Sequence, residues 1–220
     1  MSKARTPEQE QETREALFLV SARAFLRDGY EATSMKMLAA EAGCTTGKFY
    51  SNFSGKQEIL SELLSVLFEK NYEEAVKLSA KKDSFFGALA FLDMILQGGA
   101  LYENLLGIYR EGLALHETRT IAEAYLAKLL SAPEEREAKL RIRVAVGAIP
   151  DYLKQCSEWE YEALEKLYLT MLGTMLGRSE EEAAMYAELL IKDARPVREK
   201  AYDGIVKLLQ GRKKKSVKKM

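Results

Sequence analysis

Residues 33–60 constrain the fold most strongly, because two short helical patterns stand there on either side of a glycine and a longer one follows. Thr33 precedes the first pattern as a candidate hydroxyl N-cap. Gly43 is predicted to turn the chain at positive φ, so that a second helix starts at Thr45 and ends near Phe53. The apolar residues of the first helix are Met35, Leu38, Ala39 and Ala42. The spacing predicts two helices joined by a tight turn, with a third helix behind them.

The second helix has one apolar face, which carries Phe49 and Phe53. Its remaining side chains are small, polar or cationic and stay free of that face: Thr46, Gly47, Lys48, Tyr50, Ser51 and Asn52. Such groups suit the phosphate-lined groove of double-stranded DNA, which the pattern therefore predicts as a partner. The alternative is that they are ordinary solvated groups around a three-helix core.

These residues resemble the TetR family of bacterial repressors. The resemblance rests on Thr33, Leu38-Ala39, Ala42-Gly43, Thr45-Thr46-Gly47-Lys48-Phe49-Tyr50, Phe53, Lys56 and Ile59-Leu60, all at the family's spacing without gaps. An upstream apolar stripe that closes with Gly29-Tyr30 also fits, so the likeness covers roughly the first quarter of the chain. It implies an all-α fold: a three-helix helix-turn-helix head followed by an all-helical ligand-binding and dimerisation domain.

The resemblance also implies roles for single residues. Thr46 and Gly47 would lie closest to base edges in the major groove, and Tyr50 with the lysines would hold phosphates. Asn52 stands where the family usually has histidine. The residues predicted to contact DNA are Thr33, Lys36, Thr45, Thr46, Gly47, Lys48, Tyr50, Ser51, Asn52 and Lys56. Lys3, Arg5 and Arg14 lie beside this head and could touch DNA as well.

The charge is balanced overall but unevenly distributed. Residues 1–56 sum to +1, residues 57–211 to −7 and residues 212–220 to +6. We therefore expect a helix-turn-helix DNA-binding domain at 1–56, a helical regulatory and dimerisation domain at 57–211, and a basic, disordered tail at 212–220. A head of only +1 makes the direction in which its lysines point more important than bulk basicity.

Beyond residue 56 the pattern is helical throughout, with no alternating strand pattern. A long segment at 56–79 would link the head to the body as a lever. Breaks, including one at Gly98-Gly99, and capping-box spacings at Ser131, Ser157 and Ser179 delimit the later helices. The expected helices are 84–97, 100–115, 118–130, 133–155, 157–176 and 179–210. Pro150 and Pro196 should kink or break two of them.

A homodimer and a small-molecule effector are implied by the resemblance. Residues 157–176 carry an apolar stripe that fits either a dimer interface or packing within one subunit: Leu164, Leu167, Tyr168, Met171, Leu172 and Met175. Among the aromatic residues of the body, Phe91, Tyr109 and Trp159 are candidate ligand contacts, although they could equally be core.

Other classes of function find little support. An enzyme would need a nucleophile with its base, a metal cluster or a phosphate loop, and the chain offers one histidine, His116, and two cysteines, Cys44 and Cys156, without ligand spacing. We therefore expect no enzyme, no metal and no cofactor. No run of apolar residues suffices for a membrane span, which favours a cytoplasmic protein with no membrane partner. A helical adaptor that binds other proteins without DNA remains the alternative.

Overall fold

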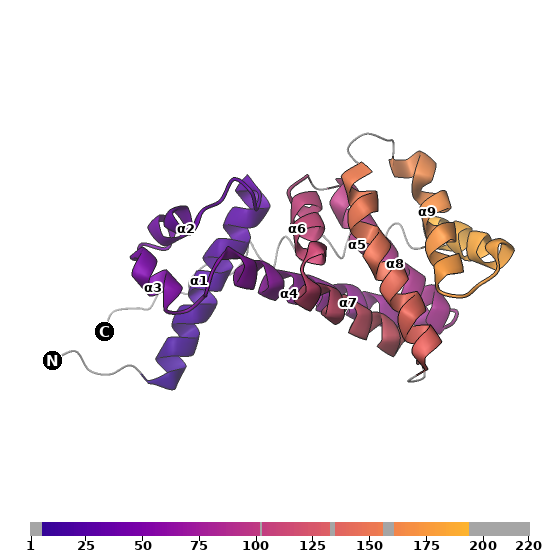
Figure 1. Cartoon of the computed structure of the whole chain (residues 1–220), viewed down its shortest axis with the longest axis horizontal. Helices are drawn as coiled ribbons and strands as arrows, with labels where there is room; N and C mark the ends of the chain where they lie inside the picture. Colours follow the sequence, from indigo (N-terminus) through magenta and orange to yellow (C-terminus); the bar gives the residue numbers. More distant parts are fainter. Residues whose placement is uncertain (1–5, 102, 133–134, 156–160, 194–220) are drawn as a thin grey trace.

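The computed structural model describes residues 6–101, 103–132, 135–155 and 161–193, and within these ranges the chain is helical with no strand. Figure 1 shows a small group of helices at one end, a long helix leading away from it, and a larger helical body at the other end. The predicted all-α class is confirmed.

The head consists of α1 (Pro7–Asp28), α2 (Met35–Glu41) and α3 (Thr46–Tyr50). α1 starts with a capping box, in which the Thr6 hydroxyl accepts from the Gln9 amide and the Gln9 side chain accepts from the Thr6 amide. Its buried face carries Leu17, Ala22 and Phe25. This face packs against α2 and α4, and so gives the two short helices a surface on which to fold.

α4 (Lys56–Ser79) runs from the head into the body, as residues 56–79 predicted (Figure 1). Its apolar stripe is fully buried along its length and includes Ile59, Leu63, Leu67 and Ala75. The first turns of α4 pack on α1, while later turns pack on α5 and α7. One continuous helix therefore belongs to the cores of both parts.

The body contains α5 (Ser84–Leu101), α6 (Glu103–Ala114), α7 (His116–Leu129), α8 (Arg136–Gln155) and α9 (Tyr161–Met175), and residues 180–193 are also helical. α5 is buried on all sides from residue 85 to residue 99. A helix with no polar face must lie at the centre of its domain, and the other body helices surround it accordingly.

The predicted break at Gly98-Gly99 is wrong, because α5 continues through both residues. A Cβ atom at position 99 would lie 2.6 Å from Leu153 Cδ2, so Gly99 allows α5 and α8 to approach closely instead of ending a helix. α7 likewise starts two residues earlier than expected, at His116, and Thr118 lies inside it with its hydroxyl 3.2 Å from that of Ser61.

The expected break at Pro150 does not occur, since α8 continues to Gln155. Its neighbours Ile149 and Leu153 are buried, and their packing holds the helix together despite the missing backbone donor. The capping box at Ser179 is confirmed by its reciprocal hydrogen bonds with Glu182. Ser157 and Pro196 lie outside the described residues, as does the tail.

The crossing of α4 and α5 depends on Gly87. A Cβ atom there would lie 1.7 Å from Ser79 Oγ and 2.7 Å from the carbonyl oxygen of Ala75. We expect Gly87→Ala to lower the free energy of unfolding by about 1–3 kcal/mol, because two backbones must separate. Gly147→Ala, which meets nothing within 4 Å, should raise it by up to about 1 kcal/mol. Urea denaturation measures both, and equal effects would contradict the close crossing.

Candidate functional site: a nucleic-acid interface and a body cavity

The turn between α2 and α3 has the geometry that the sequence predicts. Gly43 has φ of +64°, and the amide of Cys44 donates to the carbonyl of Ala39 at 2.9 Å. Thr45 then caps α3, its hydroxyl accepting from the Lys48 amide at 3.2 Å. The predicted glycine turn and threonine cap are both confirmed, and together they fix where α3 begins.

Two phenylalanines anchor α3 in the head. Phe49 and Phe53 are 0% and 1% exposed, with ring centroids 6.1 Å apart. The opposite side of the helix presents Thr46, Gly47 and Tyr50 to solvent, and the Tyr50 side chain is 55% exposed. A ligand as large as a DNA duplex can therefore reach the polar side of α3 while the aromatic side holds it in place.

The polar residues at and just beyond the end of α3 interact with one another. Ser51 Oγ donates to the Lys48 carbonyl at 2.8 Å, and Asn52 Nδ2 donates to the same carbonyl at 2.8 Å and to Ser51 Oγ at 3.2 Å. The amide of Asn52 thus satisfies a carbonyl at the end of α3, so its donor group is engaged within the protein.

Thr33 has a different role from the predicted cap, which is a correction. The N-cap of α2 is Ser34, whose hydroxyl accepts from the Met37 amide at 3.3 Å. Thr33 is 2% exposed; its hydroxyl donates to the Gly29 carbonyl at 2.7 Å and its amide to the Tyr30 carbonyl at 3.3 Å. It therefore closes the loop between α1 and α2, while Lys36 stays exposed on α2.

Lys56 also lies against this loop. Its ammonium donates to the carbonyls of Tyr30 at 2.7 Å and Thr33 at 2.9 Å, and lies 4.1 Å from the centre of the Tyr30 ring. An ammonium group has three donors, so one remains after these two bonds. Lys56 therefore links the first residue of α4 to the loop between α1 and α2.

Arg14 points inward, contrary to the expectation that it lies beside DNA. Its guanidinium bonds to Glu58 at 3.0 Å and to Glu62 at 2.7 Å, and lies 4.3 Å from the centre of the Phe53 ring. Glu58 and Glu62 are four residues apart, a spacing that puts both carboxylates on one face of α4. That spacing is the signal from which this contact could have been predicted.

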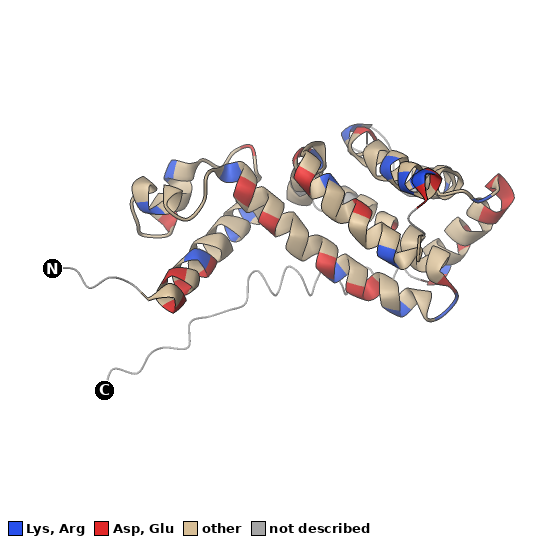
Figure 2. Ribbon diagram, turned by 60° about the horizontal axis from the view of Figure 1, so that its bottom comes forward, with Lys and Arg blue, Asp and Glu red and all other residues tan. Residues whose placement is uncertain are grey.

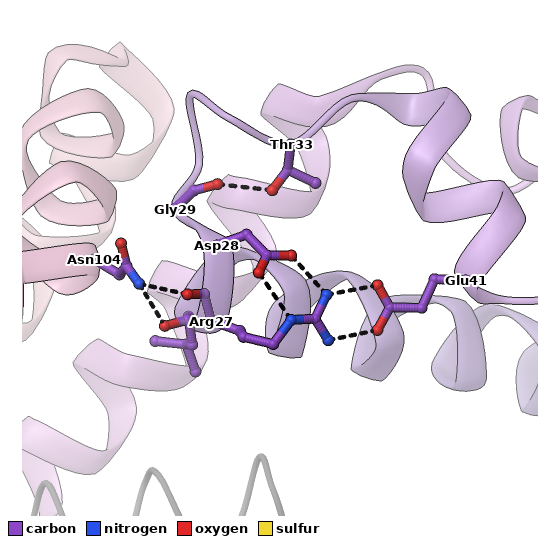
Figure 3. Close-up of polar contacts among 7 residues, drawn as sticks. Arg27, Asp28, Gly29, Thr33, Glu41 and Asn104 are labelled. Carbon is purple, nitrogen blue, oxygen red and sulfur yellow. Dashed lines mark hydrogen bonds and ion pairs between the residues drawn. The ribbon is translucent and has the colours of Figure 1, made fainter.

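The charge near α3 is more favourable than the sum of +1 suggests. Glu41 is the only acidic residue between Thr33 and Phe53, and both its oxygens bind the Arg27 guanidinium, at 2.8 and 2.9 Å (Figure 3). This bidentate pair lowers the pKa of Glu41. Figure 2 shows the basic residues of α2 and α3 in blue on the ribbon. The acidic residues in the first turns of α1, in red, lie near the end of the chain marked N.

The body has a separate cavity of about 250 Å³ between α5, α8 and α9. Its lining is apolar and aromatic apart from one carboxylate: Leu96, Ala148, Ile149, Asp151, Tyr152, Tyr168, Met171, Leu172 and Met175. Phe91 and Tyr109 lie elsewhere, fully buried beside Phe68 with ring centroids 6.1 and 6.2 Å from it. Trp159 lies outside the described residues.

The apolar stripe of α9 is only partly buried. Leu172 is buried within the subunit, whereas Leu167 and Met171 are 54% and 44% exposed. In the described part of the chain no group of three potential metal ligands occurs. Its helices also include none with the length and apolar character that crossing a bilayer requires.

Two short helices joined by a tight turn, with a buried aromatic side and an exposed polar side, define a helix-turn-helix head. Residues 17–63 match the family described as "Bacterial regulatory proteins, tetR family".

Two named bacterial proteins are similar in sequence to part of the chain. It is 31% identical over 119 residues to the probable HTH-type transcriptional regulator ArpR of Pseudomonas putida, and 30% identical over 119 residues to the HTH-type transcriptional regulator TtgR of the same species. Each match covers 54% of this chain and 51% of the relative, so the chain spans about half the length of these relatives.

The crystal structure of RolR in complex with the ligand resorcinol has a similar fold. The TM-score is 0.67 at 14% identity, and the match covers 83% of this chain and 96% of that one.

The link between α1 and α4 gives a prediction about pH. The Ser54 amide donates to Glu58 at 2.7 Å, and this bond, aided by the Ser54 hydroxyl and Arg14, lowers the pKa of Glu58 from its ordinary 4.5. A lowered carboxyl pKa stabilises the fold above pH 4.5, and the effect disappears as pH falls through the folded pKa. We expect Glu58→Gln to cost about 1 kcal/mol at neutral pH, since both partners are partly exposed and solvent screens the pair. The cost should be smaller at about pH 3, because the carboxylate of the unaltered protein is increasingly protonated below pH 4.5.

Urea denaturation at the two pH values measures this difference. Glu137→Gln is the matched control, because it removes an exposed pair with Arg141 in α8, far from the head. A cost of Glu58→Gln that does not change with pH would show that the carboxylate's charge contributes nothing.

Proposed function

We propose that this protein is a sequence-specific DNA-binding transcriptional regulator that acts in the cytoplasm as a homodimer. The observation that carries the proposal is the exposed polar side of α3, held outward by Phe49 and Phe53 and next to a carboxylate that Arg27 neutralises. α3 enters the major groove, where Thr46 and Gly47 approach base edges. The names of the two relatives, each an HTH-type transcriptional regulator, support the same function.

The residues expected at DNA then divide into two groups. Exposed or half-exposed groups on α2 and α3 contact phosphates or bases directly: Lys36, Thr45, Thr46, Gly47, Lys48, Tyr50 and Ser51. Thr33, Asn52 and Lys56 are buried or half-buried and donate to carbonyls of the head, so they hold the loop, the end of α3 and the start of α4 in place. These three residues fix the position of α3 through contacts inside the head.

The proposed dimer is argued from the short stretch of DNA that a single head can cover. One α3 covers only a few base pairs, whereas two heads about 34 Å apart, or a multiple of it, read both halves of an inverted repeat. The exposed Leu167 and Met171 on α9, with Met185 on the next helix, offer an apolar face for the partner. Repression follows if the occupied site overlaps a promoter.

The cavity supports regulation by a small molecule. A volume of about 250 Å³ with tyrosine, methionine and aliphatic lining fits a compound with about one aromatic ring. RolR was crystallised with resorcinol, a molecule of this size. A ligand that lowers operator affinity tenfold must favour the unbound arrangement by about 1.4 kcal/mol.

A helical adaptor without DNA is the competing function. It has no use for the accessible side chains of Lys48 and Tyr50 on this five-residue helix, and it predicts no DNA phenotype when they change.

The test is duplex binding by α3 variants. The full chain is first used to select sequences from a random duplex library, and an inverted repeat is expected. Tyr50→Ala and Lys48→Ala should each weaken binding to it about tenfold, because each removes a group that contacts the DNA backbone. Only Lys48→Ala should also reduce the dependence of log affinity on log salt by about one phosphate contact, because lysine is charged and tyrosine is not.

Lys70→Ala serves as the control, since it removes an exposed pair with Glu73 on α4. Circular dichroism should be unchanged for all three variants. Affinities equal to that of the unaltered chain for both α3 variants would favour the adaptor.

A second prediction concerns the cavity. We expect millimolar resorcinol to raise the thermal midpoint of the unaltered protein. Ala148→Phe places a ring inside the cavity and should abolish this rise, while ligand-free DNA affinity stays the same. Val144→Phe, one turn away and outside the cavity lining, should keep the response. A shift that survives Ala148→Phe would place the ligand elsewhere.

A further inference from the structure

Asn104 connects the body to the head. It lies in the first turn of α6, and its Nδ2 donates to the carbonyls of Leu26 and Arg27, both at 2.9 Å (Figure 3). The last turn of a helix leaves carbonyls without partners inside the helix, and these two belong to the end of α1. One side chain of the body therefore completes the end of a head helix that lies 77 residues or more away in sequence.

The same turn of α1 is tied to α2. The Arg27 side chain binds both oxygens of Glu41, the last residue of α2, and also pairs with Asp28 at 2.6 Å. Glu41 is followed two residues later by the Gly43 turn that leads into α3. The contacts thus run from α6 to the end of α1 and on to the end of α2, directly before the helix proposed to read DNA.

The opposite part of α6 is fixed to α4 and to the cavity side of the body. A Cβ atom at Gly112 would lie 1.7 Å from Leu64 Cδ1, so α6 and α4 are in close contact there. Asn71 of α4 donates to the hydroxyl of Tyr109 at 3.4 Å. α6 also packs on α8, which lines the cavity. α6 therefore contacts the cavity-lining helix α8 at one place and, through Asn104, the end of α1 at another.

We infer that Asn104 is a positioning residue, which fixes the angle of the head relative to the body and releases it when α6 moves. α4 alone gives one attachment, about which the head can still turn. Asn104 supplies a second attachment away from the α4 axis and so removes that freedom. The inference rests on the proposed function, because it concerns how the two heads of a dimer are held at the spacing of their DNA site.

The experiment uses the full chain with Asn104→Ala and Asn104→Asp. Affinity is measured for the selected inverted repeat and for a duplex with a single half-site. Asn104→Ala should weaken binding to the inverted repeat about tenfold and change half-site binding less than about twofold, because each head stays intact while its orientation is lost. The salt dependence should not change, since no phosphate contact is removed.

Asn104→Asp should have the larger effect. Its carboxylate meets two carbonyl oxygens at the negative end of the α1 dipole, so the contact becomes repulsive instead of merely absent. Lys77→Ala, which removes an exposed pair with Glu74 near the far end of α4, is the control and should bind both duplexes normally.

Two results would overturn the inference. The first is that Asn104→Ala binds the inverted repeat as tightly as the unaltered chain does. The second is that Asn104→Ala loses as much affinity for the half-site as for the inverted repeat, which would mean that Asn104 supports the fold of the head itself. Amide exchange of the segment 29–34 separates this from a failure of the proposed function. Even if the unaltered chain binds no duplex selectively, faster exchange in Asn104→Ala would show that the contact restrains the head, and unchanged exchange would refute it.

Discussion

The burial of Phe49 and Phe53 is the interaction on which the head depends. α3 has five residues, and a helix this short does not persist in water unless tertiary contacts hold it. Both rings are almost completely buried, and Arg14 covers Phe53 while it binds the two glutamates of α4. The same contacts that make α3 a helix therefore decide which of its sides faces outward.

Electrostatics in the head are local and not a matter of net charge. A sum of +1 over 56 residues gives a weak long-range attraction to DNA. What matters is that Glu41 is held by Arg27 and that Lys36 is left exposed on α2. Lysine positions alone mislead here, because Lys56 is used inside the protein and Lys36 is not.

The body combines two requirements that compete for the same helices. α5 must be apolar on all sides to fill the centre, and the crossings at Gly87 and Gly99 bring its backbone close to α4 and α8. Around it, α8 and α9 leave a cavity, while α6 touches α1, α4 and α8. α6 is thus placed to connect a change at the cavity with the orientation of the head, over and above the continuous α4.

The sequence by itself determined the helical class, the glycine turn at Gly43, the cap at Thr45, the extent of α4 and the buried pair Phe49 and Phe53. Each of these follows from local conformational preference or helical periodicity, which act between residues close in the chain. Only the tertiary structure decided that Thr33 is buried, that Arg14 turns inward, that Gly99 serves a helix crossing and that Asn104 reaches α1. Arg14 and Asn104 find partners 44 and 78 residues away, and the other two outcomes depend on how separate segments pack together. No spacing within a single segment records such a partner.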